Sequence, residues 1–169
     1  CISDQDSSGG LIECIIEGMP AGVGEPVFDK LDASLAKAVM SIGAVKGVEI
    51  GDGFSVTSSK GSINNDSFIS ENGQVLKQTN HSGGILGGIS DGSSIILRAA
   101  IKPTPSISQP QKTVNTAGEN IEIAISGRHD PVIVPRAVVV VESMAAITLT
   151  DLLMQNMTSR IEYLKNIYL

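Results

Sequence analysis

The segment SGRHDPVIVPRA, residues 126–137, places a guanidinium, an imidazole and a carboxylate side by side between two apolar runs. The planar fork of Arg128 suits a carboxylate or a phosphate, which it can bind through two parallel hydrogen bonds. Asp130 precedes Pro131 and could act as a base, orient a neighbouring group or form a turn. The alternative is an Arg–Asp pair that only structures a loop leading into a helix, and the local sequence alone favours it.

Two further loops carry groups that could hold an anion. Residues 102–106, KPTPS, follow a predicted strand with a cation, a hydroxyl and a rigid backbone, although a solvated lysine beside a proline-bent loop is the simpler interpretation. Residues 80–92, NHSGGILGGISDG, contain glycines that let a backbone turn sharply or approach a ligand closely. Their spacing fits neither the dinucleotide-binding nor the phosphate-loop pattern, so turn glycines are favoured when this segment is taken alone.

Other classes of chemistry find little support. His81 and His129 lie far apart without paired spacing, which disfavours a zinc or iron site. Cys1 and Cys14 are too few for a disulfide framework and indicate a reducing compartment. The net charge of −6 and the pI near 4.8 argue against a nucleic-acid partner but leave room for a small phosphorylated ligand.

The most apolar run, residues 137–153, is interrupted by Glu142 and Asp151, which are costly in lipid, so we expect no membrane partner. The polar start of the sequence does not resemble a signal peptide. Because the first residue is Cys1 rather than methionine, we interpret the sequence as a fragment of a longer chain.

The elements that must position these loops follow from hydrophobic periodicity. The 169 residues, 41% of them hydrophobic and 18% charged, predict one globular domain with a sizeable core. Strands outnumber helices without alternating regularly with them, so the predicted fold class is α+β. Strands are predicted at residues 11–18, 45–50, 55–59, near 74–78, at 93–101 and at 120–126.

The strand at 120–126 alternates and should therefore be half-buried. Apolar side chains at spacings of three and four predict a helix over residues 27–42, with Pro26 in its first turn. A second, long helix is predicted from residue 136 to about 168, led in by Pro135. Residues 60–80 are predicted to be a long polar excursion.

Three stretches together are more specific than any one alone: residues 18–54, residues 80–92 with 102–107, and residues 127–137. In this order and at this spacing they resemble the C-terminal half of the chorismate synthase family. The resemblance covers nearly the whole chain and weakens in residues 60–79 and beyond about Asn156. It implies helices sandwiched between antiparallel sheets, a β-α-β sandwich of which this chain would form about half.

Residues 1–169 are accordingly expected to be the C-terminal portion of a chorismate synthase domain. The N-terminal half, which carries the family's catalytic histidines and an Arg-Ser-Ser flavin segment, is expected to be absent. The fragment alone is therefore expected to be inactive. Two alternatives stay open: a non-catalytic folded fragment, and a flavin or phosphate-ester binding module on the same scaffold.

The resemblance also implies a reaction. The family's enzyme is a phosphate lyase of the shikimate pathway that converts 5-enolpyruvylshikimate 3-phosphate to chorismate, on the way to the aromatic amino acids. The trans-1,4-elimination requires reduced FMN although no net redox change occurs, and NADPH would serve only as a source of flavin reduction. A cytoplasmic homotetramer is implied as well.

The same resemblance gives roles to individual residues. Asp130 matches an acidic residue placed near flavin N5, where it is thought to take part in proton transfer, and Arg128 matches a residue at the substrate–flavin junction. Pro105 stands where a serine is common, which removes one hydrogen-bonding group. The expected catalytic residues are Asp130 and Arg128, and the expected cofactor-binding residues are Gly43, Ala44, Gly87, Lys102, Pro103, Thr104, Pro105, Ser106 and Arg128.

Overall fold

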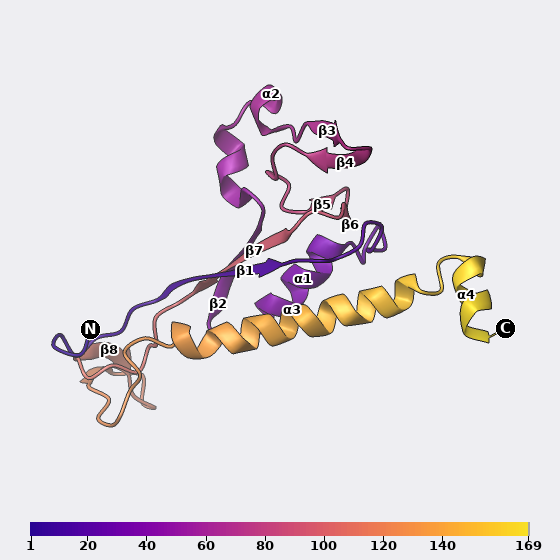
Figure 1. The fold of residues 1–169 in the computed structure, drawn as a ribbon. Helices are drawn as coiled ribbons and strands as arrows, with labels where there is room; N and C mark the ends of the chain where they lie inside the picture. The colour runs from indigo at the N-terminus through magenta and orange to yellow at the C-terminus, as the bar shows by residue number, and fades with distance from the viewer. Residues whose placement is uncertain (169) are drawn as a thin grey trace.

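The fold, a computed structural model, is built on one antiparallel sheet with two helices on one of its faces (Figure 1). The structure describes residues 1–168. In chain order its elements are β1 (Gly10–Ile16), α1 (Leu31–Met40), β2 (Val45–Ile50), η1 (a 3₁₀ helix, Gly53–Ser58), α2 (Gly61–Asn64), β3 (Phe68–Glu71), β4 (Gln74–Lys77), β5 (Ile85–Leu86), β6 (Ile89–Ser90), β7 (Ile95–Ile101), β8 (Gln111–Val114), β9 (Asn120–Ile123), α3 (Val134–Asn156) and α4 (Ile161–Tyr168).

Strand β7 is the centre of the three-stranded sheet, whose order is β1-β7-β2. Leu97 pairs with Cys14 on one side and with Ile50 on the other. Side chains at every second position of β7 are buried, because successive residues of a strand point to opposite faces. The buried set is Ile95, Leu97, Ala99 and Ile101.

Helices α1 and α3 cover this buried face and pack against each other. α1 contributes Leu31, Leu35 and Val39, at the spacing of one helical face. α3 contributes Val141, Ala145, Leu149 and Leu152. These residues and those of β7 form one hydrophobic core, so the α+β prediction is confirmed.

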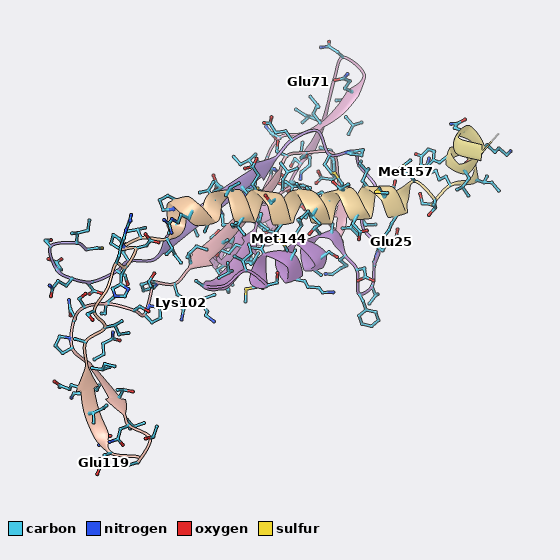
Figure 2. All side chains as sticks on the ribbon, turned by 90° about the horizontal axis from the view of Figure 1, so that it is seen from below. Glu25, Glu71, Lys102, Glu119, Met144 and Met157 are labelled. Carbon is cyan, nitrogen blue, oxygen red and sulfur yellow. The ribbon has the colours of Figure 1, made fainter. Side chains whose placement is uncertain are left out.

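The remaining strands form three separate two-stranded ribbons, β3-β4, β5-β6 and β8-β9. Figure 2 shows the β8-β9 ribbon ending near Glu119 and the β3-β4 hairpin ending near Glu71, both projecting away from the helix–sheet body. The strand predicted at 120–126 therefore exists as β9, but the prediction that it is half-buried is wrong. Every residue of β9 is exposed, because no second layer of the described chain covers the ribbon.

Four other predictions need correction. The first helix begins at Leu31, and Pro26 lies outside it, because Glu25 and Asp29 pair across a turn and the Leu31 N–H donates to Gly88 O. Residues 55–58 form the end of η1 rather than a strand, and Ser59 caps it. Hydroxyl groups of this segment donate to carbonyls three residues earlier, which favours the 3₁₀ conformation; they belong to Ser55, Thr57 and Ser58.

The predicted long C-terminal helix is two helices, α3 and α4, with Pro135 in the first turn of α3 as expected. Thr158 and Ser159 interrupt it, and the Thr158 hydroxyl donates to Gln155 O. Residues 60–80 are more ordered than predicted, because β3 and β4 form a hairpin. Asn72 and Gly73 both have positive φ angles at its turn, as a two-residue hairpin loop requires.

α3 is the one helix among residues 1–168 that is long and apolar enough to cross a membrane. That match is weak evidence, because a helix that packs in the core of a globular protein passes the same test, and one face of α3 is buried in this core. Val138, Val139 and Ile147 lie on its exposed side.

A substitution at the fully buried Leu35 tests the packing of the core. Leu35→Ala should lower the free energy of unfolding by about 2–5 kcal/mol, because it removes apolar contacts and leaves a cavity between α1 and the sheet. Urea denaturation followed by circular dichroism measures this loss. Leu11→Ala, at a position 59% exposed on β1, is the matched control and should cost less than about 1 kcal/mol. Equal losses in the two variants would contradict the proposed core.

Candidate functional site

The N-terminal segment joins two loops that the sequence singled out. The Ser7 hydroxyl donates to Thr104 O at 2.6 Å, and the Ser8 N–H donates to Pro131 O at 2.9 Å. Ser8 also forms an isolated parallel bridge with Val132. Residues 102–106 and 127–132, which lie far apart in the sequence, are therefore held beside the same short segment.

An open pocket of about 150 Å³ lies where these three segments meet. Ser106, His129, Asp130 and Pro131 line it together with the first residues of the chain. Sequence reasoning missed this N-terminal contribution. The only available signal was the polar run of residues 3–8 directly before the first strand, which matches no chemical motif.

Asp130 is half-buried, and its carboxylate accepts a hydrogen bond from Arg136 in the first turn of α3 at 2.6 Å. The Arg–Asp pair that the sequence left open therefore exists, but Arg136 rather than Arg128 supplies the guanidinium. Arg128 is exposed, and no carboxylate among residues 1–168 pairs with it. A ring nitrogen of His129 lies 3.1 Å from Ile125 O, so its N–H donates within the same loop.

The segment after α1 lies against the KPTPS loop. The Lys102 N–H donates to Ala44 O at 2.9 Å, which places Gly43 and Ala44 beside residues 102–106. Ala44 has a φ of 72°, a left-handed conformation that is uncommon for a residue with a side chain and that concentrates at functional positions. The Thr104 Oγ1 atom is buried and has no hydrogen-bond partner among the described residues. A buried hydroxyl without a partner is costly, which is consistent with a polar group of a ligand at this position.

Gly87 is not part of this group. It lies in the turn between β5 and β6, and the next residue, Gly88, accepts a hydrogen bond from the N–H of Leu31 at the start of α1. Gly43 and Ala44 follow the other end of that helix. Because ten residues of α-helix rise about 15 Å, Gly87 and Ala44 lie at opposite ends of α1. The structure thus brings together Gly43, Ala44, Lys102 through Ser106, and the loop of Arg128 and Asp130, but leaves Gly87 apart.

The loop that carries Gly87 is anchored by buried charges. Asp66, Lys77 and Asp91 have side chains that are only 4%, 4% and 8% exposed. Burial opposes the ionisation of Asp66, but hydrogen bonds from Ser82, Thr79 and the His81 backbone outweigh it and hold its pKa well below the usual range. The pKa of Asp91 is also lowered, since hydrogen bonds from Lys77 and Ser93 outweigh its burial.

Neither a thiol nucleophile nor a metal centre is supported among residues 1–168. Burial and the nearby Glu142 raise the pKa of the Cys14 thiol, so this cysteine lacks the thiolate character of a nucleophile. No group of three or more His, Cys, Asp and Glu side chains within residues 1–168 is arranged to hold a metal ion.

The depressed pKa of Asp66 predicts how stability changes with pH. Its contribution is fully present above the unfolded-state pKa of about 3.9 and is lost as the pH falls from there toward the lower folded-state pKa. Asp66→Asn should be less stable at neutral pH and lose less additional stability in acid. Urea midpoints measured from neutral pH to about pH 3 test this. The control variant, Asp151→Asn at an exposed position of α3, should keep the parent slope. Parallel slopes for Asp66→Asn and the parent would contradict the assignment.

Comparisons with known proteins place this geometry in a family. The family model for chorismate synthase matches residues 1–154. A chorismate synthase of Lachnoclostridium phytofermentans is 69% identical over 169 residues, which are 99% of this chain and 46% of that protein. One of Agathobacter rectalis is 62% identical over 168 residues, with the same coverage.

A solved structure titled "Crystal Structure of Chorismate Synthase" superposes with a TM-score of 0.74 at 32% identity, covering 93% of this chain and 41% of that one. This chain therefore spans about half the length of the relatives it matches. With the family model matching most of its residues and close relatives matching nearly all of them, the chain belongs to the chorismate synthase family.

Proposed function

We propose that residues 1–169 are the C-terminal portion of a chorismate synthase and supply about half of its active site. The reaction would be the conversion of 5-enolpyruvylshikimate 3-phosphate to chorismate with loss of phosphate. The observation that supports this most is the convergence of three loops, residues 43–44, 102–106 and 128–130, through the Lys102–Ala44 contact and the N-terminal segment. In a member of this family, the converging loops would hold the cofactor and the substrate next to each other.

The residues present fit a flavin. Lys102 offers a cation for an anionic edge, and the buried, unpartnered hydroxyl of Thr104 offers a hydrogen bond to a polar one. When bound, reduced FMN would supply the electron that lets phosphate leave, without net redox change. NADPH would enter only as a source of flavin reduction. Pro103 and Pro105 would keep the loop rigid, and Ser106 lines the pocket beside Asp130.

Arg128 would bind the substrate, and Asp130 would take part in proton transfer. Arg128 would hold a carboxylate or the phosphate of the substrate, and each charge-assisted hydrogen bond would contribute about 1.5–3 kcal/mol. Asp130 would exchange a proton at its carboxylate, which the contact with Arg136 orients toward the pocket. Gly43 and Ala44 would bring backbone atoms close to the cofactor.

Flavin titration tests the proposal. We expect this polypeptide to bind FMN, observed by absorbance and fluorescence, and to bind it more tightly with substrate present. Arg128→Ala should weaken FMN binding in the presence of substrate by about tenfold or more, because a charge-assisted contact is lost. Most of the affinity gained from substrate would then disappear. Arg160→Ala, at an exposed position near α4, is the matched control and should leave both affinities unchanged.

A coupled chorismate assay separates the alternatives. The chain alone should be inactive, and addition of the remaining part of the Lachnoclostridium relative should produce turnover that Asp130→Asn removes. Flavin binding without any turnover after this addition would favour a flavin-binding module. The absence of both binding and complementation would favour a folded, non-catalytic piece and contradict the proposed function.

We further propose self-association, with a homotetramer as the assembly of the full-length family member and a cytoplasmic location. Exposed valine and isoleucine side chains along α3 support self-association, because extended exposed apolar surface is uncommon on monomers. Sedimentation velocity should show species larger than the monomer. Val139→Lys should shift them toward the monomer, whereas Val114→Lys on the β8-β9 ribbon should not. A parent chain that sediments only as a monomer would contradict this proposal.

A further inference from the structure

A buried lysine lies at the base of the glycine-rich loop. Lys77 is the last residue of β4, and its ammonium donates to Asp91 Oδ2 at 2.8 Å and to Ser82 Oγ at 2.8 Å. It also lies 3.1 Å from Asp66 Oδ2 and from Asn80 Oδ1. With its side chain only 4% exposed, Lys77 has exchanged nearly all of its water for these four oxygen atoms.

Three of the four partners belong to the two ends of one loop, and Asp66 lies outside it. Asn80 and Ser82 open residues 80–92, and Asp91 closes them. The Asp91 N–H donates to Gly84 O at 3.0 Å, which joins the same two ends through the backbone. The ammonium therefore sits at the neck of the loop and holds its two ends together.

Asp66 and Asn80 connect the neck of the loop to main-chain atoms through hydrogen bonds. Asp66 accepts hydrogen bonds from the N–H groups of His81 and Ser82 at 2.8 and 3.0 Å. The Asn80 side chain accepts from the Gly84 N–H and donates to Ser94 O, both at 2.8 Å. Each of these groups fixes main-chain atoms of the loop or of the segment that leads into β7.

A short, paired segment leads from the neck to Gly87. Ile85 pairs with Ser90 and Leu86 with Ile89, so two ladder steps separate the neck from the turn. Ser90 is buried; its hydroxyl accepts from the Val23 N–H and donates to Pro20 O. Because this ribbon is short and anchored on one side, a shift at the neck would displace Gly87 as well.

Apolar packing does not account for this arrangement. A buried ion pair seldom stabilises a protein more than well-packed apolar side chains of similar volume would, but it fixes directions that apolar contacts leave free. Glycines give the loop little of its own rigidity, since they restrict the backbone least. Ten residues of the loop have no apolar side chain with which to pack: Asn80, His81, Ser82, Gly83, Gly84, Gly87, Gly88, Ser90, Asp91 and Gly92.

We propose that Lys77, with Asp66 and Asp91, is a positioning residue that holds residues 80–92 in one conformation and thereby places Gly87 against its ligand, the flavin. The flavin contact of Gly87 is what the resemblance to the family implies, and it rests on the proposed function, whereas the ordering of the loop does not. The polar excursion between η1 and the glycine-rich loop, where the resemblance to the family is weakest, supplies both Lys77 and Asp66. It thus serves the loop that follows it.

Hydrogen exchange of the intact chain, measured by mass spectrometry on peptides, tests the ordering directly. Lys77→Met keeps the length of the side chain but removes its charge, and Asp91→Asn keeps the shape of the carboxylate. Both should raise exchange in residues 80–92 by about tenfold or more, because local opening becomes easier, while β7 keeps its protection. Lys112→Met, on the exposed β8, is the matched control and should change neither region.

FMN titration of the same variants provides the second readout. Weaker FMN binding by Lys77→Met together with faster loop exchange would support the whole proposal. Faster loop exchange in the two variants, with a parent chain that binds no FMN, would uphold the positioning of the loop and count against the proposed function. Unchanged loop exchange in both variants, with β7 still protected, would overturn the proposal. If Lys77→Met does not fold, Asp91→Asn decides the question.

Discussion

Strand β7 constrains the rest of the structure, because it is paired on both edges and buried on one face. It pairs with β1 over all of Ile95–Ile101 and with β2 over Leu97–Ile101, and it contributes Ile95, Leu97, Ala99 and Ile101 to the core. The glycine-rich loop enters this strand and the KPTPS loop leaves it. Six steps of about 3.4 Å separate Ile95 from Ile101, so these loops begin about 20 Å apart. The position of each loop is therefore set by a strand that cannot slide without exposing the core.

This separation bears on how a site could be completed. The loops of Ala44, Lys102 and Asp130 gather at one end of the sheet, and Gly87 lies toward the other end. One chain with a rigid β7 does not bring both ends to the same point. A cofactor held beside Lys102 could contact the Gly87 loop of a second copy of the chain. The apolar exposure along α3 is consistent with such an assembly.

Periodicity predicted the parts of the fold that depend on apolar burial. The strand predicted at residues 93–101 and the helix predicted from the three-and-four spacing of Leu31, Leu35 and Val39 are both confirmed, as β7 and α1. The β3-β4 hairpin was missed although its Asn72–Gly73 turn is a recognised signal, because the flanking residues lack clear alternation. The break between α3 and α4 was missed because the apolar pattern continues across Thr158 and Ser159.

The candidate site was predictable only where its residues lie in recognisable stretches. Lys102 through Ser106 and Asp130 were found in this way, but Ser7 and Arg136 were not, since their roles depend on contacts made in the folded chain. The same holds for the lysine beneath the glycine-rich loop. Nothing in the spacing of Asp66, Lys77 and Asp91 identifies them as partners, because eleven and fourteen residues separate them and no helix or strand joins them.

Two kinds of interaction thus stabilise different parts of this chain. Apolar burial has no preferred direction, and it holds α1 and α3 on the sheet without fixing the loops. Charge-assisted hydrogen bonds are directional, and in the glycine-rich loop they add to the single residue, Ile85, that the loop contributes to the hydrophobic core. A loop with few apolar side chains can therefore adopt one conformation only where buried charges find all their partners. That condition is met for Lys77, and it explains why a segment without a hydrophobic pattern is nevertheless well defined in the fold.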